Sequence, residues 1–131
     1  MSGAFEALRI ANSALGAHQT WLDSLAGNIA NTNTITSTDE NAFQATYVIF
    51  SARPDGGVDV GGLAQSSAEG RLVNDPNHPL ADEDGYVRAP DVDMSSQMSQ
   101  LIMAQRGFQA AVQVTKTAQD EYTAALQIGA R

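Results

Sequence analysis

The sequence lacks cysteine and is poor in basic residues. A chain without thiols has no disulfide framework, no thiolate nucleophile and no cysteine-based zinc site. Seven Lys and Arg stand against fifteen Asp and Glu, which gives a net charge of −8. Because nucleic acids and anionic lipids attract clustered Lys and Arg, this balance argues against either as a binding partner.

Long apolar runs are also missing. No segment contains the ~18 uninterrupted apolar residues that a membrane-spanning helix needs, so direct membrane insertion is not expected. The first residues show no positively charged stretch followed by an apolar one, so no cleaved secretory signal is expected. With 131 residues, 43% of them hydrophobic, the chain suits one ordinary folded domain.

No motif of an enzyme or a cofactor site is present. The patterns of P-loops, nucleophile elbows, zinc proteases and dinucleotide-binding turns do not occur. His18 and His78 lie far apart in the chain, and neither has a metal-ligand spacing around it. The segment 82–85 is similar to part of a calcium loop, but Leu80 stands where the first carboxylate ligand must lie. We therefore predict a non-enzymatic protein with no catalytic, metal or cofactor-binding residues.

The N-terminal segment 3–33 has the periodicity of an amphipathic helix. Apolar positions and one histidine follow one another at spacings of three and four: Leu8, Ala11, Leu15, His18, Leu22, Leu25 and Ile29. Gly16 and Gly27 each cost about 1 kcal/mol relative to Ala inside a helix. This helix is therefore weak alone and depends on a partner surface.

The C-terminal segment predicts a second, more regular helix. Pro90 closes the preceding loop, Asp91 or Asp93 is placed to cap the helix, and the helix runs to about Ile128 with Gly129 as the stop. Two interleaved seven-residue series form a seam over about four heptads: Leu101, Phe108, Thr115 and Tyr122, with Ala104, Ala111, Ala118 and Ala125. A row of Ala allows another helix to approach closely.

The middle of the chain has the character of short strands. β-Branched and aromatic residues predict a strand over 43–50, and further short strands over 71–73 and 86–88. The glycine pairs at 56–57 and 61–62 predict hairpin turns on either side of another short strand.

The predicted fold class is α+β. Residues 1–35 and 90–131 form an antiparallel, coiled-coil-like inner domain of two terminal helices, and residues 36–89 form a small β-rich outer module inserted between them. Charge divides in a similar way, because residues 34–89 carry nine acidic and three basic side chains, or −6 of the total −8. This division suggests apolar assembly through the ends and a solvated middle.

Some apolar positions fall outside the helix seams. Ile10, Ala14 and Trp21 on the first helix and Met103 and Val114 on the second are expected to stay exposed, and exposed apolar surface usually marks a partner interface. We predict subunit packing through ten positions: Leu15, Leu22, Leu25, Ile29, Leu101, Phe108, Ala111, Ala118, Tyr122 and Leu126. The other interpretation is that the stripe on the second helix is the core of the same chain.

Three segments resemble a known family. The segment 24–34, SLAGNIANTNT, is similar to the signature A-x-N-(L/I)-A-N-x-N-T of flagellar rod and hook proteins. The segments 75–93 and 98–129 resemble the proximal rod proteins of that axial family. The matching motif residues are Asn28, Ala30, Asn31, Asn33, Thr34, Asp75, Pro76, His78, Pro79, Gly85, Tyr86 and Pro90. Because Asn and Thr side chains compete with helical pairing, Asn28, Asn31 and Asn33 are expected to end the first helix.

The resemblance implies a structural subunit of the flagellar basal-body rod. It implies polymerisation through the terminal helices within a torque-transmitting drive shaft, with copies of the chain and other rod subunits as partners. It also implies transit through the flagellar type III export apparatus, without a cleaved signal peptide, to the periplasmic rod. The acidic and uncharged segment 34–43 departs from the family, whose members commonly carry basic residues there. The alternative is a discrete soluble homo-oligomeric helical adaptor or interaction module.

Overall fold

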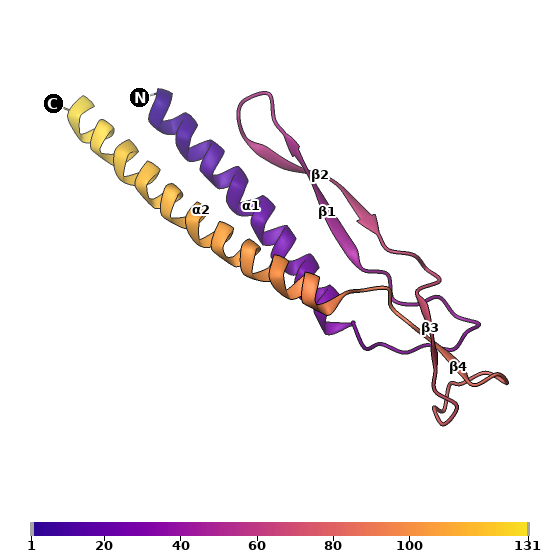
Figure 1. The fold of residues 1–131 in the computed structure, drawn as a ribbon. Coiled ribbons are helices and arrows are strands. Elements are labelled where there is room, and N and C mark those ends of the chain that lie inside the picture. The colour runs from indigo at the N-terminus through magenta and orange to yellow at the C-terminus, as the bar shows by residue number, and fades with distance from the viewer. Residues whose placement is uncertain (1, 131) are drawn as a thin grey trace. The chain divides into compact units, whose positions relative to one another are not determined.

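The structure is a computed structural model that describes residues 2–130 (Figure 1). Its elements, in chain order, are α1 (Ser2–Ala30), β1 (Thr46–Ala52), β2 (Val58–Gln65), β3 (Arg71–Asn74), β4 (Tyr86–Ala89) and α2 (Met94–Gly129). The strands form two two-stranded sheets, β1–β2 and β3–β4. Two long helices with short strands between them confirm the predicted α+β class. Within the described residues, neither helix has an apolar stretch long enough to span a bilayer.

The ends of both helices are set by short polar side chains. α1 ends at Ala30, earlier than predicted, because the Asn31 side-chain amide donates to the Gly27 carbonyl at 2.9 Å and competes with a further helical turn. At the start of α2, the Asp93 carboxylate accepts the backbone amides of Ser95 and Ser96 at 3.3 Å each. Asp93 is therefore the N-cap, as one of the two predicted candidates.

The first two strands differ from the prediction in extent. β1 begins at Thr46 rather than at residue 43, because the preceding backbone is held by Ser66, whose hydroxyl accepts the Ala45 amide at 2.8 Å. Gly56 lies in the turn between β1 and β2 with a φ of 89°, which confirms the turn at 56–57. The predicted turn at 61–62 is wrong, since β2 continues through both glycines. A Cβ at Gly61 would lie 3.0 Å from the Ser51 Cβ, so glycine permits a close approach to β1.

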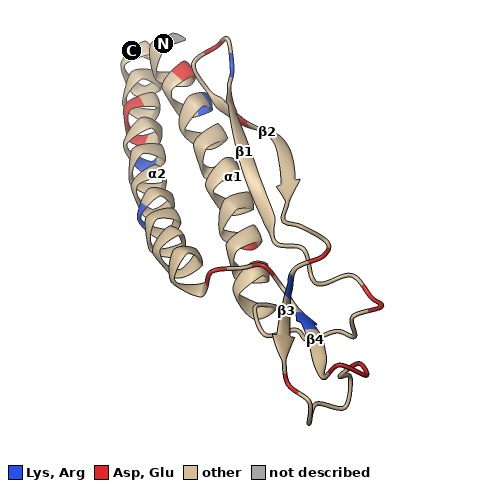
Figure 2. Ribbon diagram, turned by 45° about the vertical axis from the view of Figure 1, so that its right-hand side comes forward, with Lys and Arg blue, Asp and Glu red and all other residues tan. Residues whose placement is uncertain are grey.

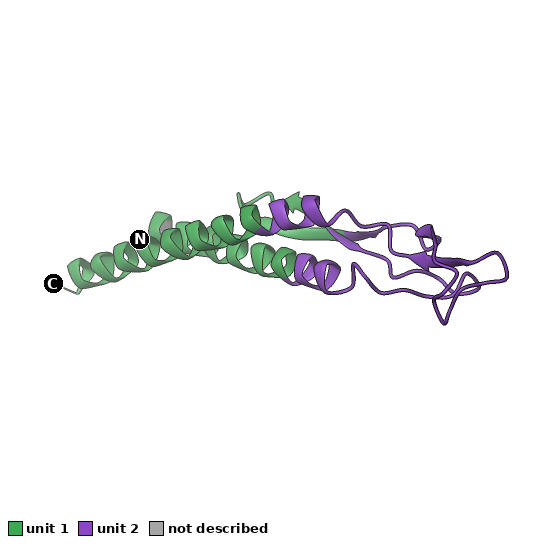
Figure 3. Cartoon of the chain, turned by 60° about the horizontal axis from the view of Figure 1, so that its bottom comes forward, with its two compact units in different colours: residues 1–22, 48–62, 102–131 green, residues 23–47, 63–101 purple. Residues whose placement is uncertain are grey.

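The chain divides into two compact units (Figure 3). Unit 1 contains the N-terminal residues through Leu22, residues 48–62 and the chain from Ile102 onward. Unit 2 contains residues 23–47 and 63–101. The turn between β1 and β2 thus belongs with the longer parts of both helices. The predicted division into an inner domain and an outer module remains a prediction.

Unit 1 is built on a close antiparallel helix pair. The rings of Phe5 and Tyr122 lie 6.2 Å apart near the two chain ends, which lie side by side in Figure 1. Further along, a Cβ at Gly107 would lie 2.7 Å from the His18 Cδ2 atom, so the imidazole rests directly on the α2 backbone. Three alanines of the predicted series in α2 are buried: Ala104, Ala111 and Ala118. These three are core of this chain, as the second interpretation held, whereas Ala125 is half-buried.

The β1–β2 turn region covers the other side of α1. Gly56 approaches the Ile10 side chain, with a Cβ position 3.3 Å from Cδ1. The Phe50 ring meets Trp21 edge-on at 5.7 Å and His18 at 6.4 Å. The prediction that Ile10, Ala14 and Trp21 stay exposed is wrong, because all three are only partly accessible. Sequence periodicity shows an apolar face and not which segment covers it.

On α2, by contrast, Met103 and Val114 are exposed as predicted. Both helices therefore bury a shared face, but α2 keeps further apolar side chains in contact with solvent.

Substitution of Ala111 by Leu is expected to destabilise the folded chain. Ala111 is 7% exposed, and added methylenes in a packed core typically cost about 1–3 kcal/mol. Urea unfolding followed by circular dichroism should show a lower midpoint. Ala110→Leu is the matched control, since Ala110 is exposed on the same helix. Equal midpoints for the two variants would contradict a close helix pair at Ala111.

Candidate assembly interface

Asn28 joins three segments of unit 2. Its side-chain nitrogen donates to the Gln97 Oε1 atom and to the Thr46 carbonyl, each at 2.9 Å. Its side-chain oxygen accepts the Thr46 backbone amide at 2.8 Å. Asn28 is 1% exposed, and Gln97 is also buried. The prediction that Asn28 ends α1 is therefore wrong. Its buried amide instead links α1, β1 and the first turns of α2 through hydrogen bonds from both of its polar atoms.

Asn31 does act at the end of α1. Its bond to the Gly27 carbonyl closes the last turn, and its Oδ1 atom accepts the Thr34 hydroxyl at 3.2 Å. Ala30, Asn33 and Thr34 are exposed. The expectation that Asn33 helps to end the helix remains a prediction.

The loop between β3 and β4 explains several further motif residues. The two strands are antiparallel, with Asn74 opposite Tyr86. The Asp75 amide donates to the Gly85 carbonyl at 2.9 Å, which continues the pairing by one step. Gly85 has a φ of 85°, and a Cβ there would lie 3.0 Å from the Pro76 ring. Both the backbone conformation and the close contact favour glycine at this position.

Three further motif residues lie in this loop or directly after β4: His78, Pro79 and Pro90. The His78 ring accepts the Leu80 amide through Nδ1 at 3.1 Å. Pro79 is exposed, whereas Pro90 is buried and its carbonyl accepts the Arg71 Nε–H at 3.4 Å.

The acidic segment 82–85 forms a turn around Asp82. One carboxylate oxygen accepts the Tyr86 amide at 2.9 Å and the Asp84 amide at 3.0 Å, and the other accepts the Thr38 hydroxyl at 3.1 Å. The Tyr86 amide is the main reason why the pKa of Asp82 lies below its ordinary value. Both oxygens of the Asp82 carboxylate therefore accept hydrogen bonds from within the chain. In the part of the chain that the structure describes, no cluster of three or more metal-binding side chains occurs.

Arg88 organises the segment 34–43, which departs from the family pattern. Thr36 and Arg88 form an antiparallel bridge with two backbone hydrogen bonds of 2.9 Å. The Arg88 guanidinium donates to the carbonyls of Thr38, at 2.7 Å, and Glu69. In the sequence, the signal for this role of Arg88 is weak, a single cation within a short predicted strand that lies near acidic loops. Figure 2 shows how acidic residues gather in these loops.

An ion-pair cluster fixes the turn between β1 and β2 to α1. Asp55 pairs with Arg9 of α1 and, at 3.1 Å, with Arg53. The Ser13 hydroxyl accepts the Val58 amide at 3.1 Å. The pKa of Asp55 is lowered, first because the carboxylate accepts the Gly57 amide and then because both guanidinium groups lie nearby.

Outside the face that packs on α1, α2 carries several uncovered apolar side chains. Six of its apolar residues are more than two-fifths exposed beyond residue 101: Ile102, Met103, Val112, Val114, Leu126 and Ile128. Exposed apolar patches rimmed by polar residues mark interaction sites in soluble proteins. These side chains lie on both flanks of α2. Together they are called the α2 surface, and this surface is the candidate assembly interface.

The ten predicted packing residues differ in their exposure. Leu25, Ala111 and Ala118 are buried, Leu126 is exposed, and the others are half-buried: Leu15, Leu22, Ile29, Leu101, Phe108 and Tyr122. Only Leu126 contributes strongly to the α2 surface. A role of these residues in packing between subunits remains a prediction.

Known proteins share these sequence features. Residues 83–128 match the family model described as flagellar basal body rod FlgEFG protein C-terminal. Over 125 residues, the chain is 35% identical to the flagellar basal-body rod protein FlgC of Salmonella typhimurium and 39% identical to that of Yersinia enterocolitica. These matches cover 92% of this chain and 93% of each relative. The chain belongs to the FlgC family of flagellar basal-body rod proteins.

A more distant FlgC protein, from Borreliella burgdorferi, is 27% identical over 148 residues, with 96% of this chain and 97% of that relative covered. Membership of the FlgC family confirms the predicted function in its general form. The chain is a structural subunit of the flagellar basal-body rod and not an enzyme. Its place is the flagellar basal body, and its partners are copies of itself and other flagellar components.

Removal of the Asn28 amide is expected to destabilise the fold strongly. Asn28→Ala leaves the Thr46 amide and the Gln97 side chain without partners, and each buried unsatisfied group costs about 1–3 kcal/mol. The free energy of unfolding from urea titration measures the effect. Asn31→Ala is the matched control, because it removes bonds only at the exposed end of α1. Similar losses for both variants would refute the joining role of Asn28.

The Asp55 cluster predicts sensitivity to acid. A lowered pKa means that the cluster stabilises the fold above the ordinary Asp value of 3.8, and that this contribution is lost as the pH falls through the folded-state pKa. Asp55→Asn should therefore be less stable at neutral pH and should lose less stability than the unmodified chain below about pH 4. Thermal unfolding across pH measures both effects. Asp59→Asn is the control, since Asp59 lies 3.7 Å from Arg53 and is well exposed. An unchanged acid limb in Asp55→Asn would contradict the assignment.

Proposed function

We propose that the chain polymerises through its terminal helices and forms part of the torque-transmitting drive shaft in the periplasmic rod. The observation that carries the proposal is the exposed apolar surface of α2. One face of α2 is already covered by α1 within the chain, whereas Met103, Val114 and Ile128 remain more than half exposed. Neighbouring subunits would remove them from water, at roughly 25 cal/mol per Å² of apolar surface.

Long helices suit the transmission of torque. Dispersion contacts are weak one by one, but a side-by-side helix pair makes many of them along its length. Contacts between unlike surfaces of identical subunits generate an open helical filament when the rotation between neighbours does not close into a ring. A shaft built in this way resists twisting because every turn of helix contributes to the resistance.

Folding and assembly are proposed to be coupled. α1 contains Gly16 and Gly27, and a Cβ atom added at either position would meet no neighbouring atom within 4 Å. Glycine at these positions thus weakens the helix without serving close packing. A chain that completes its helices only on neighbours would also pass more readily through the flagellar type III export apparatus. Periplasmic chain in cells without that apparatus would contradict this route.

Dilute and concentrated samples should differ in both helix content and mass. We expect circular dichroism to show helix content that rises with concentration, together with a continuous growth of particle mass in light scattering. Met103→Gln should raise the concentration required for growth about tenfold, because burial of a Met side chain is worth ~1.5–3 kcal/mol.

Leu63→Gln is the matched control for this experiment. Leu63 is 60% exposed on β2, and Met103 is 58% exposed on α2, so both variants remove a similar apolar surface. Only the α2 variant should affect growth. A fixed particle mass at all concentrations, typical of a closed oligomer, would contradict the proposal.

A further inference from the structure

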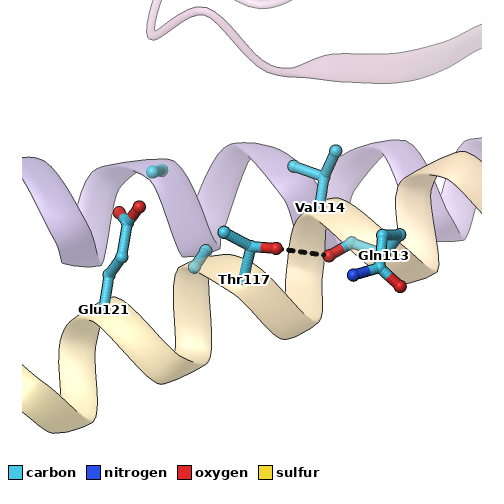
Figure 4. Close-up of a pocket in the computed structure, with 6 residues that line it drawn as sticks. Gln113, Val114, Thr117 and Glu121 are labelled. Carbon is cyan, nitrogen blue, oxygen red and sulfur yellow. Dashed lines mark hydrogen bonds between the residues drawn. The ribbon is translucent and has the colours of Figure 1, made fainter.

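A groove lies beside the helix pair of unit 1. Its lining comes from one residue of α1 and five of α2: Ala7, Gln113, Val114, Thr117, Ala118 and Glu121. In Figure 4, the side chains of Val114, Thr117 and Glu121 point the same way from α2. The Thr117 hydroxyl donates to the Gln113 carbonyl at 3.1 Å, so it makes no demand on a ligand. The groove is therefore mainly apolar, with one carboxylate at its end.

The groove is large enough for an apolar side chain. Its volume is about 240 Å³. This exceeds the ~150 Å³ of an apolar cavity that binds benzene. It exists because Ala7 and Ala118 present only methyl groups where the helices meet.

The opposite flank of α2 carries the matching chemistry. Helical geometry of 3.6 residues per turn places Val112 and Lys116 on one flank and Val114 and Glu121 on the other. Val112 is 45% exposed, and Lys116 is exposed one turn beyond it. Within residues 2–130, neither Lys116 nor Glu121 forms an ion pair. Each flank thus offers one apolar side chain and one unpaired charge, and the charges are opposite.

The register of these residues favours one orientation. When Val112 of an incoming helix enters the groove between Val114 and Ala118, Lys116 lies ~6 Å further along the axis. In a parallel arrangement this places its ammonium group at Glu121. In an antiparallel arrangement Lys116 would instead lie toward Arg106, in a part of α2 that contains no carboxylate before Asp120.

We infer that the groove binds α2 of a second copy of this chain, with Val112 inserted and Lys116 paired with Glu121. The inference rests on the proposed polymerisation and specifies one of its contacts. The two surfaces differ and lie on opposite flanks of the same helix, so each copy can bind one neighbour on each side. Such a head-to-tail contact can repeat from copy to copy, and it builds a filament when its rotation does not close into a ring.

Cysteine cross-linking tests the contact directly, because the chain has no native cysteine. Chains carrying Val112→Cys and chains carrying Thr117→Cys are mixed, assembled and oxidised. We expect disulfide-linked dimers that contain one chain of each kind. Val112→Cys mixed with Thr123→Cys is the control, since Thr123 lies on the same flank as Val112 and should give no such product.

Charge exchange provides an independent readout. Lys116→Glu and Glu121→Lys should each raise the concentration required for assembly several-fold, because each places like charges together. The double variant K116E/E121K should restore assembly, since the exchanged pair is again complementary. A general effect of charge or stability would not produce this rescue. Asp120→Lys is the control for the charge change, because Asp120 lies next to Glu121 but outside the groove lining.

The outcomes separate the contact from the proposed function. Mixed cross-links together with rescue by the double variant support the inference. Polymers that give no mixed cross-link, or a double variant no better than the single ones, overturn the contact and leave polymerisation standing. Failure of the unmodified chain to grow beyond a fixed mass overturns both.

Discussion

The close approach of α1 and α2 is the constraint on which the rest of unit 1 depends. Gly107 lets the His18 ring lie against the α2 backbone, and buried alanines before and after it in α2 keep the helices near each other. Helices that meet through methyl groups bury little apolar area per residue, so larger apolar side chains remain on the flanks. The same small residues that hold the pair together also leave α2 open to neighbours.

Unit 2 depends on directional bonds rather than on close-packed helices. Asn28 connects three segments through both polar atoms of its side chain, and Arg88 holds two loops through backbone carbonyls. A buried amide that is bonded through both polar atoms fixes one arrangement, because any displaced segment leaves a polar group unsatisfied. An asparagine within the family signature thus has a structural reason that its position near a helix end conceals.

Periodicity and turn chemistry predicted both helices, a cap at Asp91 or Asp93, and the α+β class, since these follow from residues close in sequence. They did not predict that residues 48–62 cover Ile10 and Trp21, because an apolar stripe does not identify its partner. The predicted strand ended before residues 61–62 because a glycine pair usually indicates a turn. In the structure, β2 continues through both glycines, and Gly61 allows a close contact with β1. The role of Asn28 and the contribution of Arg88 depend on bonds across long stretches of chain, which no local pattern reveals.

The ring contacts around His18 have a mechanical consequence. In unit 1, α1 lies between α2, which touches it at Gly107, and the β1–β2 region, which touches it at Phe50. A lateral force that acts on the exposed side of α2 is therefore transmitted through α1 to residues 48–62. Sliding of these three layers past one another is opposed on one side by the contacts of the Phe50 ring with His18 and Trp21. On the other side it is opposed by the contact of the His18 ring with the Gly107 backbone. α1, which the glycines Gly16 and Gly27 weaken, is thus the helix that is supported from two sides.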